Sequence, residues 1–220
     1  MGWVWCQWLA QTPKEQIRKP IEALVERGMK LQTNAPGRRR YRGLHDLWLL
    51  HCGIFASGSK QLKALAEQVV DASGIDGEPL QNDGELYASA WCGMLKHWIL
   101  GNRKKAAEQS EAIWGAYRYD IARVAAKPLV TKWLAGDWKS FANAQEKDFE
   151  TLWERARRDR IVVSEKRDKI VVSMDVILPG VRWCWAHCGL ALLAYRRAAE
   201  VATDPFWFPV DALACAERDL

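Results

Sequence analysis

The sequence predicts an all-α protein, an irregular multi-helix bundle of antiparallel helical hairpins that is partly repeat-like. Two observations predict this fold class. Helix start and stop signals follow one another along most of the 220 residues, and runs of β-branched residues are nearly absent before residue 161. The hydrophobic fraction of 49% can form a sizeable core. We therefore expect one domain over residues 1–220, with a basic N-terminal section at 1–43 and a helical body at 44–213.

Capping residues place the individual helices. Thr12 followed by Pro13 marks the start of a first helix, which should run towards Glu26 and stop at Gly28. Ser59 is expected to cap the helix that follows it. The helices predicted after the first one are, in chain order, 44–56, 59–72, 85–100, 103–117, 120–134, 138–158 and 173–200.

The region around 161–172 leaves two interpretations open. Its β-branched residues fall in two short runs, at 161–163 and 170–172. These runs predict either a small β-hairpin or an extended lead into the last helix.

One internal echo indicates repeated helical hairpins. The segments Trp98–Asn102 and Trp133–Asp137 match at a spacing of 35 residues. In each, a Gly ends one helix and an Asn or Asp begins the next, the roles these residues play in helix caps. Such a period is typical of stacked helical hairpins.

Two charged segments are the candidate partner-binding sites. The net charge is +5, and residues 1–43 hold nine Lys or Arg against three Glu, so the rest of the chain is close to neutral. This is not the broad basic field of a dedicated nucleic-acid binder. The basic candidates form one run: Arg38, Arg39, Arg40, Tyr41 and Arg42. The acidic candidates lie in a Gly-rich loop at 71–85 that contains no Lys or Arg: Asp76, Glu78, Asp83 and Glu85.

The arginine run has three interpretations. It can be a solvated loop, it can contact an acidic protein surface, or its arginines and tyrosine can bind phosphates and a base. The acidic loop suits a basic partner, such as the cleft of a nuclease toxin, because complementary charge also speeds encounter.

Histidine and cysteine residues favour packing over chemistry. A Cys-Gly step recurs at Cys52, Cys92 and Cys188, each time among apolar residues of a predicted helix. Small steps of this kind let helices approach closely, and a free Cys behaves as a small hydrophobic residue. Metal ligation by Cys92 with His97, or a Cys nucleophile beside His187, remain as alternatives. Glycine-rich phosphate loops are absent, and we expect neither a catalytic site nor a cofactor.

The chain also lacks the sequence features of export. Its apolar stretches fall short of the ~20 residues that span a bilayer, and its start has no basic region ahead of the apolar residues. We expect a cytoplasmic protein with reduced cysteines and no membrane partner.

Several of these features together resemble a known family. The Trp133–Asp137 closing, a long amphipathic helix ending at Leu152-Trp153, and the tail Asp-Pro-Phe-Trp-Phe-Pro-Val-Asp-Ala-Leu at 204–213 are similar to the all-helical immunity proteins of bacterial polymorphic-toxin and type VI secretion systems. The immunity protein 49 family is the most similar among them, over roughly residues 44–213. The resemblance implies a non-enzymatic protein that binds one cognate toxin and blocks its active site by occlusion or distortion. The 35-residue echo supports a second hypothesis, a tetratricopeptide-like scaffold or chaperone that binds peptide segments.

Overall fold

The described part of the protein is helical, as the sequence predicts. The computed structural model describes residues 14–34, 42–74, 83–116, 120–158, 189–203, 213 and 218–220, and residues 189–196 form a helical segment of their own. Within these ranges, pairing outside helices is limited to an isolated bridge between Asp71 and Gly74. The predicted hairpin at 161–172 lies outside the described residues. The labelled helices are α2 (Lys14–Asn34), α3 (Arg42–Ala56), α4 (Ser59–Gln68), α5 (Asp83–Ile99), α6 (Arg103–Ala116), α7 (Asp120–Ala135) and α8 (Trp138–Arg158).

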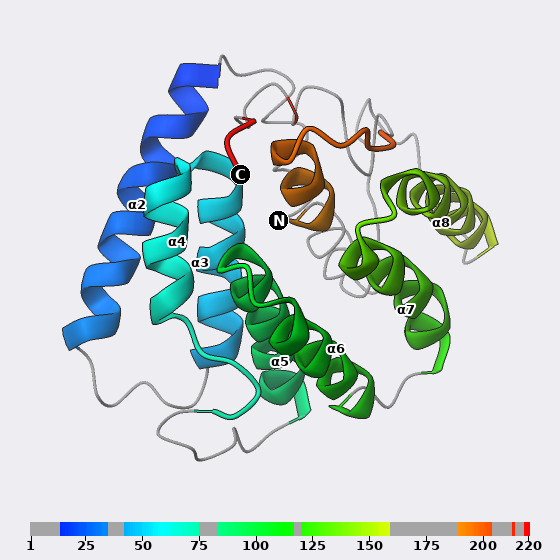
Figure 1. Cartoon of the computed structure of the whole chain (residues 1–220), viewed down its shortest axis with the longest axis horizontal. Helices are drawn as coiled ribbons and strands as arrows, with labels where there is room; N and C mark the ends of the chain where they lie inside the picture. The colour runs from blue at the N-terminus through cyan, green and yellow to red at the C-terminus, as the bar shows by residue number, and fades with distance from the viewer. Residues whose placement is uncertain are drawn as a thin grey trace, which may run out of the picture.

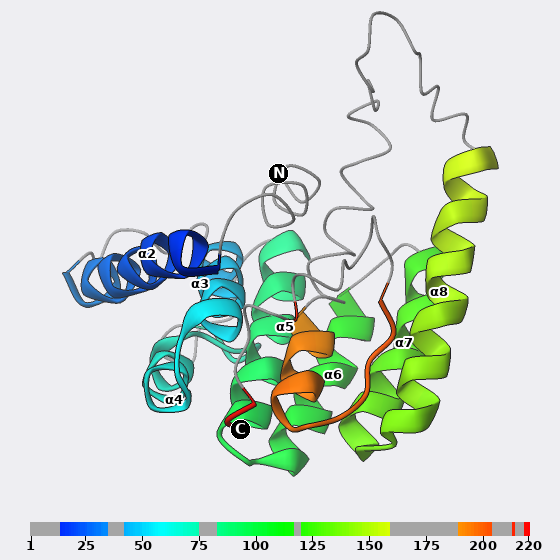
Figure 2. The ribbon, with the colours of Figure 1, turned by 90° about the horizontal axis from the view of Figure 1, so that it is seen from above.

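The helices form an irregular bundle around residues 189–196. In Figures 1 and 2, α2, α3 and α4 lie together on one side, and α7 and α8 lie on the other. The hairpin of α5 and α6 connects the two sides, and the helical segment 189–196 lies between them. The arrangement confirms an all-α multi-helix bundle.

Three predicted helix ends are wrong, and one of them is that of the last helix, which ends at residue 196 and not at about residue 200. Helix α2 does not stop at Gly28 but continues to Asn34. Gly28 is buried, and a Cβ there would lie 2.6 Å from Cδ1 of Leu49, so this glycine serves close packing of α2 on α3 and not termination. Helix α4 ends at Gln68 instead of reaching residue 72, because Val69 turns to an extended backbone with ψ 151°.

The start of α4 also differs from the prediction. Gly58, not Ser59, occupies the N-cap position, and it offers no side chain to the first backbone N–H groups. The carboxylate of Asp219 replaces the missing cap: its Oδ2 accepts from the backbone N–H of Ser59 at 2.8 Å. The N-terminus of α4 is therefore capped by Asp219, which lies 160 residues away in the sequence.

Several tryptophans lie in the core. Trp98 and Trp133, the equivalent residues of the 35-residue echo, are fully buried and stack with ring centroids 4.5 Å apart. Trp91 is also buried and meets the edge of Trp114 at 6.5 Å. Each such ring buries a large apolar area, and the offset or edge-to-face geometry adds to the stabilisation from burial.

The echo itself is confirmed at the level of hydrogen bonds. Gly101 and Gly136 both have positive φ, at 81° and 71°. Asn102 N–H donates to the carbonyl of His97, five residues back, and Asp137 N–H does the same to Lys132. This is the Schellman closing, whose positive φ favours glycine. The side chains of Asn102 and Asp137 then accept from N–H groups three residues on and cap α6 and α8.

Residues 189–203 hold the two sides of the bundle together. Trp133 Nε1 of α7 donates to the carbonyl of Leu190 at 3.0 Å, and Gln145 of α8 accepts from the N–H of Ala202. On the other side, Arg196 donates to the carbonyl of Ile54 in α3 and forms an ion pair with Asp219. Because these bonds satisfy buried polar groups, they fix the segment in one position.

None of the helices in the described ranges combines the length and apolar character needed to cross a bilayer.

Candidate partner-binding surface

The predicted acidic site includes one described side chain, and it is buried. Glu85 lies in the first turn of α5 and is 1% exposed. Its Oε2 accepts from the backbone N–H groups of Gly43 at 2.7 Å and Leu44 at 3.3 Å. Glu85 therefore caps α3 and is not available at the surface. Asp76, Glu78 and the side chain of Asp83 lie outside the described residues.

The predicted basic site also includes one described side chain, Arg42, which is held within the chain. Its Nε donates to Oδ2 of Asp46 at 2.8 Å, and its Nη2 reaches the carbonyl of Gln68 at 3.5 Å. The Asp46 side chain is fully buried, and the same Oδ2 also accepts from the N–H of Val70. Arg42 thus fixes the start of α3. Arg38, Arg39, Arg40 and Tyr41 lie outside the described residues.

Arg42 and Glu85, one from each predicted loop, both lie at the start of α3. A Cβ at Gly43 would lie 2.7 Å from the backbone oxygen of Glu85, so the lack of a side chain there lets α3 and α5 approach. Burial raises the pKa of Glu85, the two backbone donors oppose this, and the negative charge of Asp46 adds to it. We call Arg42, Asp46 and Glu85 the α3-start cluster. It is a buried polar anchor between helices.

A second polar group holds the segment after α4. Lys96 donates to the carbonyl of Val69 at 2.7 Å, and Gln109 accepts from the N–H of Ala72. His97 pairs with Asp71 at 3.3 Å. Burial lowers the pKa of His97, while Asp71 opposes that shift. The His97 ring therefore contacts the carboxylate of Asp71 and helps to hold the segment after α4.

The two described cysteines, Cys52 and Cys92, take the packing role that the sequence predicts. A Cβ at Gly53 would lie 2.6 Å from Cδ2 of Leu65, and one at Gly189 would lie 2.7 Å from Nε2 of His51. Cys52, which directly precedes Gly53, is buried, and burial raises the pKa of its thiol to about 12. Burial also raises the pKa of Cys92. A thiol held in its protonated form is a poor nucleophile and a poor metal ligand.

Within the described ranges, no group of three or more His, Cys, Asp or Glu side chains is placed to hold a metal ion. The residues Cys184, His187 and Cys188 lie outside those ranges.

The outer face of α3 carries exposed apolar side chains. Leu44 is 40% exposed and Trp48, one turn further on, is 38% exposed. Between them the side chain of His45 is 40% exposed. We call Leu44, His45 and Trp48 the α3 outer face. Its neighbours on the inner face, such as Leu49 and Leu50, are fully buried and position it.

Trp48 was not among the predicted site residues. The signal that could have separated it is its position four residues after Leu44 and three after His45, because these spacings share one helix face. The helix is apolar on most sides, which hides that pattern. An exposed Trp with an apolar neighbour is a typical anchor of a protein interface.

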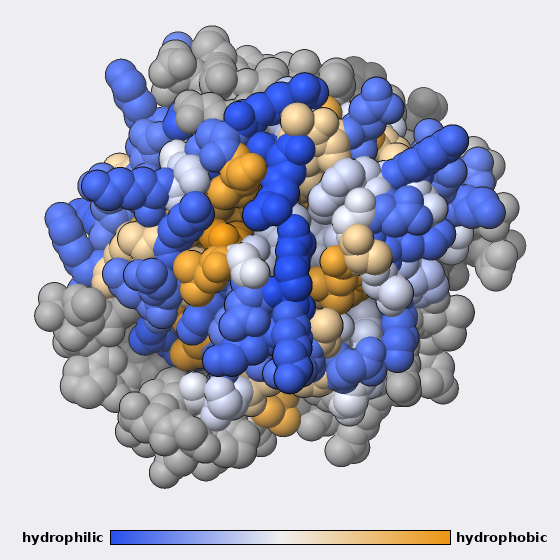
Figure 3. All heavy atoms as spheres, in the orientation of Figure 1, coloured by the Kyte–Doolittle hydropathy of each residue, from blue (hydrophilic) through white to orange (hydrophobic). Residues whose placement is uncertain are grey.

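The rest of the visible surface suits an interface with few apolar anchors. On the face drawn in Figure 3, polar and charged side chains cover most of the area, and apolar side chains reach it in small separate clusters. Protein interfaces commonly combine such anchors with a polar rim.

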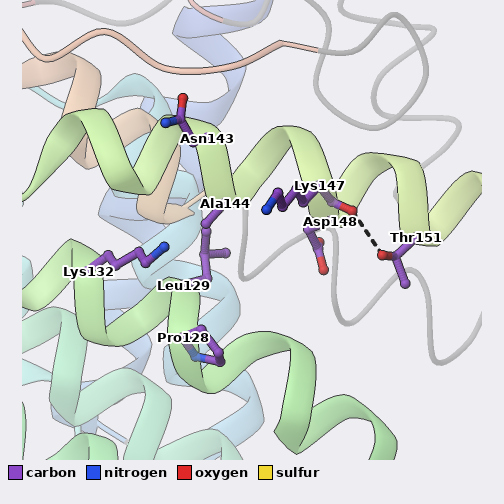
Figure 4. A pocket seen from close by; sticks show the side chains of 8 residues that line it. All are labelled: Pro128, Leu129, Lys132, Asn143, Ala144, Lys147, Asp148 and Thr151. Carbon is purple, nitrogen blue, oxygen red and sulfur yellow. Dashed lines mark hydrogen bonds between the residues drawn. The ribbon is translucent and has the colours of Figure 1, made fainter.

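A shallow hollow between α7 and α8 is a second candidate surface. It has a volume of about 280 Å³. Figure 4 shows Lys132 of α7 and Lys147 of α8 extending towards the same stretch of it, beside Ala144. Thr151 bonds to the Lys147 carbonyl at 2.9 Å and so uses its hydroxyl within α8. The charged side chains that line the hollow are Lys132, Lys147 and Asp148. Its full lining is Pro128, Leu129, Lys132, Asn143, Ala144, Lys147, Asp148 and Thr151.

The described residues thus define an all-helical bundle with an exposed aromatic face and well-packed polar anchors. Comparison of the chain with protein-family models, with curated proteins and with solved structures found no match.

Proposed function

We propose that the chain is a non-enzymatic immunity protein that binds a cognate antibacterial toxin in the cytoplasm and occludes or distorts its active site. The observation that carries the proposal is the α3 outer face, where Leu44 and Trp48 are exposed on a firmly anchored helix. The resemblance of residues 44–213 to immunity proteins, described above, supports the same class of partner.

The anchoring of α3 supports binding because a rigid surface loses little conformational entropy when a partner docks. Glu85 caps the helix, and Arg42 and Asp46 bind its first turn to the segment after α4. Trp48 is then presented on a helix whose first turn is fixed, and an exposed Trp is a residue type that often dominates an interface.

The test is co-expression of the chain with the product of the adjacent gene. We expect the two proteins to co-purify and the chain to inhibit the toxin's activity. We expect Trp48→Ala to weaken the affinity by about 2 kcal/mol, or about thirtyfold, because truncating an interfacial Trp costs that much. Leu100→Ala is the matched control, since Leu100 is 36% exposed at the far end of α5.

A gene deletion provides the biological arm of the test. If a strain without the gene resists siblings that carry the neighbouring toxin, the immunity function is excluded. Equal loss of affinity in Trp48→Ala and Leu100→Ala would instead exclude the α3 outer face as the interface.

The hollow between α7 and α8 supports a second candidate function, a tetratricopeptide-like scaffold that binds peptides. Lys132 and Lys147 would then contact acidic side chains of the peptide. Binding of an acidic peptide library that Lys132→Glu abolishes would support this function. High affinity for a single folded domain, without any peptide binding, would exclude it.

A further inference from the structure

Two arginines from distant parts of the sequence lie over the same indole. Arg103 is the first residue of α6, and Arg197 follows the helical segment 189–196. Their guanidinium carbons lie 4.5 Å and 4.4 Å from the ring centroid of Trp98. The start of α6 and the end of segment 189–196 therefore both lie against Trp98 of α5. We call Arg103, Arg197 and Trp98 the arginine pair site.

The positions of both arginines are fixed by buried structure. Trp98 is fully buried and stacks on Trp133, so the indole is a rigid platform. Asn102 caps α6 directly before Arg103. The backbone of Arg197 donates to the carbonyl of Ala194 and begins a closed turn. Both side chains are themselves exposed, so a molecule in solution can reach them.

The two positive charges lack a carboxylate partner among the described residues. Among the described residues, the arginines that form ion pairs are Arg18, Arg42 and Arg196. The contrast with the neighbouring residue is direct, because Arg196 is 2% exposed and donates two bonds to Asp219. Like charges held together repel unless an anion lies between them.

We propose that the arginine pair site binds a single oxyanion, a carboxylate or a phosphate group. Each guanidinium presents planar pairs of N–H donors that match the oxygens of such a group. The indole supports both groups through cation–π contact and leaves their donor edges free. The lowered pKa of Arg103, caused by burial and by the charge of Arg197, agrees with an uncompensated pair.

The oxyanion has two sources, a free small anion or an acidic side chain of a partner protein. The second source rests on the proposed function, and it would add a polar contact to the toxin interface. The experiment below tests the site first without any partner, so that the two proposals can fail separately.

The test is a titration of the ¹⁵N-labelled full chain with sodium phosphate and, separately, sodium acetate, against sodium chloride at equal ionic strength. The readout is the Nε–Hε cross-peaks of arginine in NMR spectra. We expect two of these peaks to shift and to saturate in the millimolar range with phosphate, acetate or both. The peaks should be lost one at a time in Arg103→Gln and Arg197→Gln, and each variant should weaken the affinity at least about fivefold.

Two control variants separate a site from general charge effects. Lys104→Gln removes the same charge from the neighbouring exposed position of α6. Arg218→Gln removes an arginine that lies over Tyr195 at 4.6 Å. Both should leave the titration unchanged. Shifts that stay linear, or that weaken equally in Lys104→Gln, would overturn the proposal.

The partner arm identifies the source of the anion. If Arg103→Gln and Arg197→Gln weaken binding of the toxin, the site receives an acidic side chain of the partner. If the phosphate titration saturates and toxin binding is unaffected, the site takes a free anion. Absence of a toxin would end the proposed function but would leave the phosphate result intact.

Discussion

The α3-start cluster and the arginine pair site handle charge in opposite ways. The α3-start cluster is buried and combines positive and negative groups. These groups form hydrogen bonds of 2.7 to 3.5 Å with backbone and side-chain atoms. The second is exposed and holds two positive groups over an indole. The difference separates charge that stabilises the fold from charge that is left for a ligand.

The comparison also shows how misleading the charge pattern of the sequence is. Arg42 and Glu85 belong to the two most strongly charged segments, yet both hold α3 in place. Arg103 and Arg197 are separated by most of the C-terminal half, and neither stands out in its own segment. Tertiary structure alone brings them together.

The largest expected effect is the loss of stability on removing Asp46. Because its carboxylate is fully buried between Arg42 and the N–H of Val70, Asp46→Ala should lower the free energy of unfolding by about 3 kcal/mol. Arg103→Gln should change it by less than about 0.5 kcal/mol, because a weak cation–π contact is lost while repulsion from Arg197 is relieved.

Urea unfolding followed by circular dichroism measures both variants, with Glu67→Ala on the exposed face of α4 as the control. Equal losses in Asp46→Ala and Arg103→Gln would show that the two sites do not differ as proposed.

A second prediction concerns pH and again separates the two sites. Burial raises the pKa of Glu85 above its ordinary value of 4.5, so the folded state holds this proton more tightly than the unfolded state does. The contribution of Glu85 to stability is therefore fully present below that ordinary value and is lost as the pH rises through the folded pKa.

Glu85→Gln removes this ionisation while keeping an oxygen that can accept from Gly43. We expect the variant to gain stability relative to the parent as the pH rises from 4.5 towards neutrality, in thermal or urea unfolding measured at a series of pH values. Arg103→Gln should show a constant difference over the same range, since arginine does not titrate there. A difference that is constant for Glu85→Gln would contradict the raised pKa.

Sequence reasoning succeeds here where local chemistry decides the structure. The Gly-Asn and Gly-Asp closings at residues 101–102 and 136–137 are local, because a positive φ favours glycine and a free N–H needs a cap. The bounds of α8 agree with the prediction, and those of α5, α6 and α7 differ from it by no more than two residues at either end.

Sequence reasoning fails where a residue far away in the sequence determines a helix end or cap. Gly28 reads as a helix end, but Leu49 packs against it and the helix continues. Ser59 reads as a cap, but Asp219 provides the cap from 160 residues away. The candidate surface follows the same rule, since the exposure of Trp48 and the meeting of Arg103 with Arg197 depend on packing that no local pattern reports.

The smallest expected effect concerns the turn that carries Arg197. The segment 189–196 closes as α5 and α7 do: Ala199 N–H donates to the carbonyl of Ala194, five residues back. The residue at the turn is Ala198, whose φ of 61° is strained for any residue with a Cβ. Gly101 and Gly136 occupy the equivalent positions without that strain.

Ala198→Gly should therefore raise the free energy of unfolding by about 0.5–1 kcal/mol, because relief of the strained φ exceeds the added entropy of the unfolded chain. The reciprocal change Gly136→Ala should lower it by about 1 kcal/mol, and thermal unfolding of both variants measures the pair. Because glycine favours the positive φ of this turn, Ala198→Gly should keep Arg197 over Trp98 and leave phosphate binding unchanged, as should Gly136→Ala. A destabilised Ala198→Gly variant would mean that the turn at Ala198 is not strained.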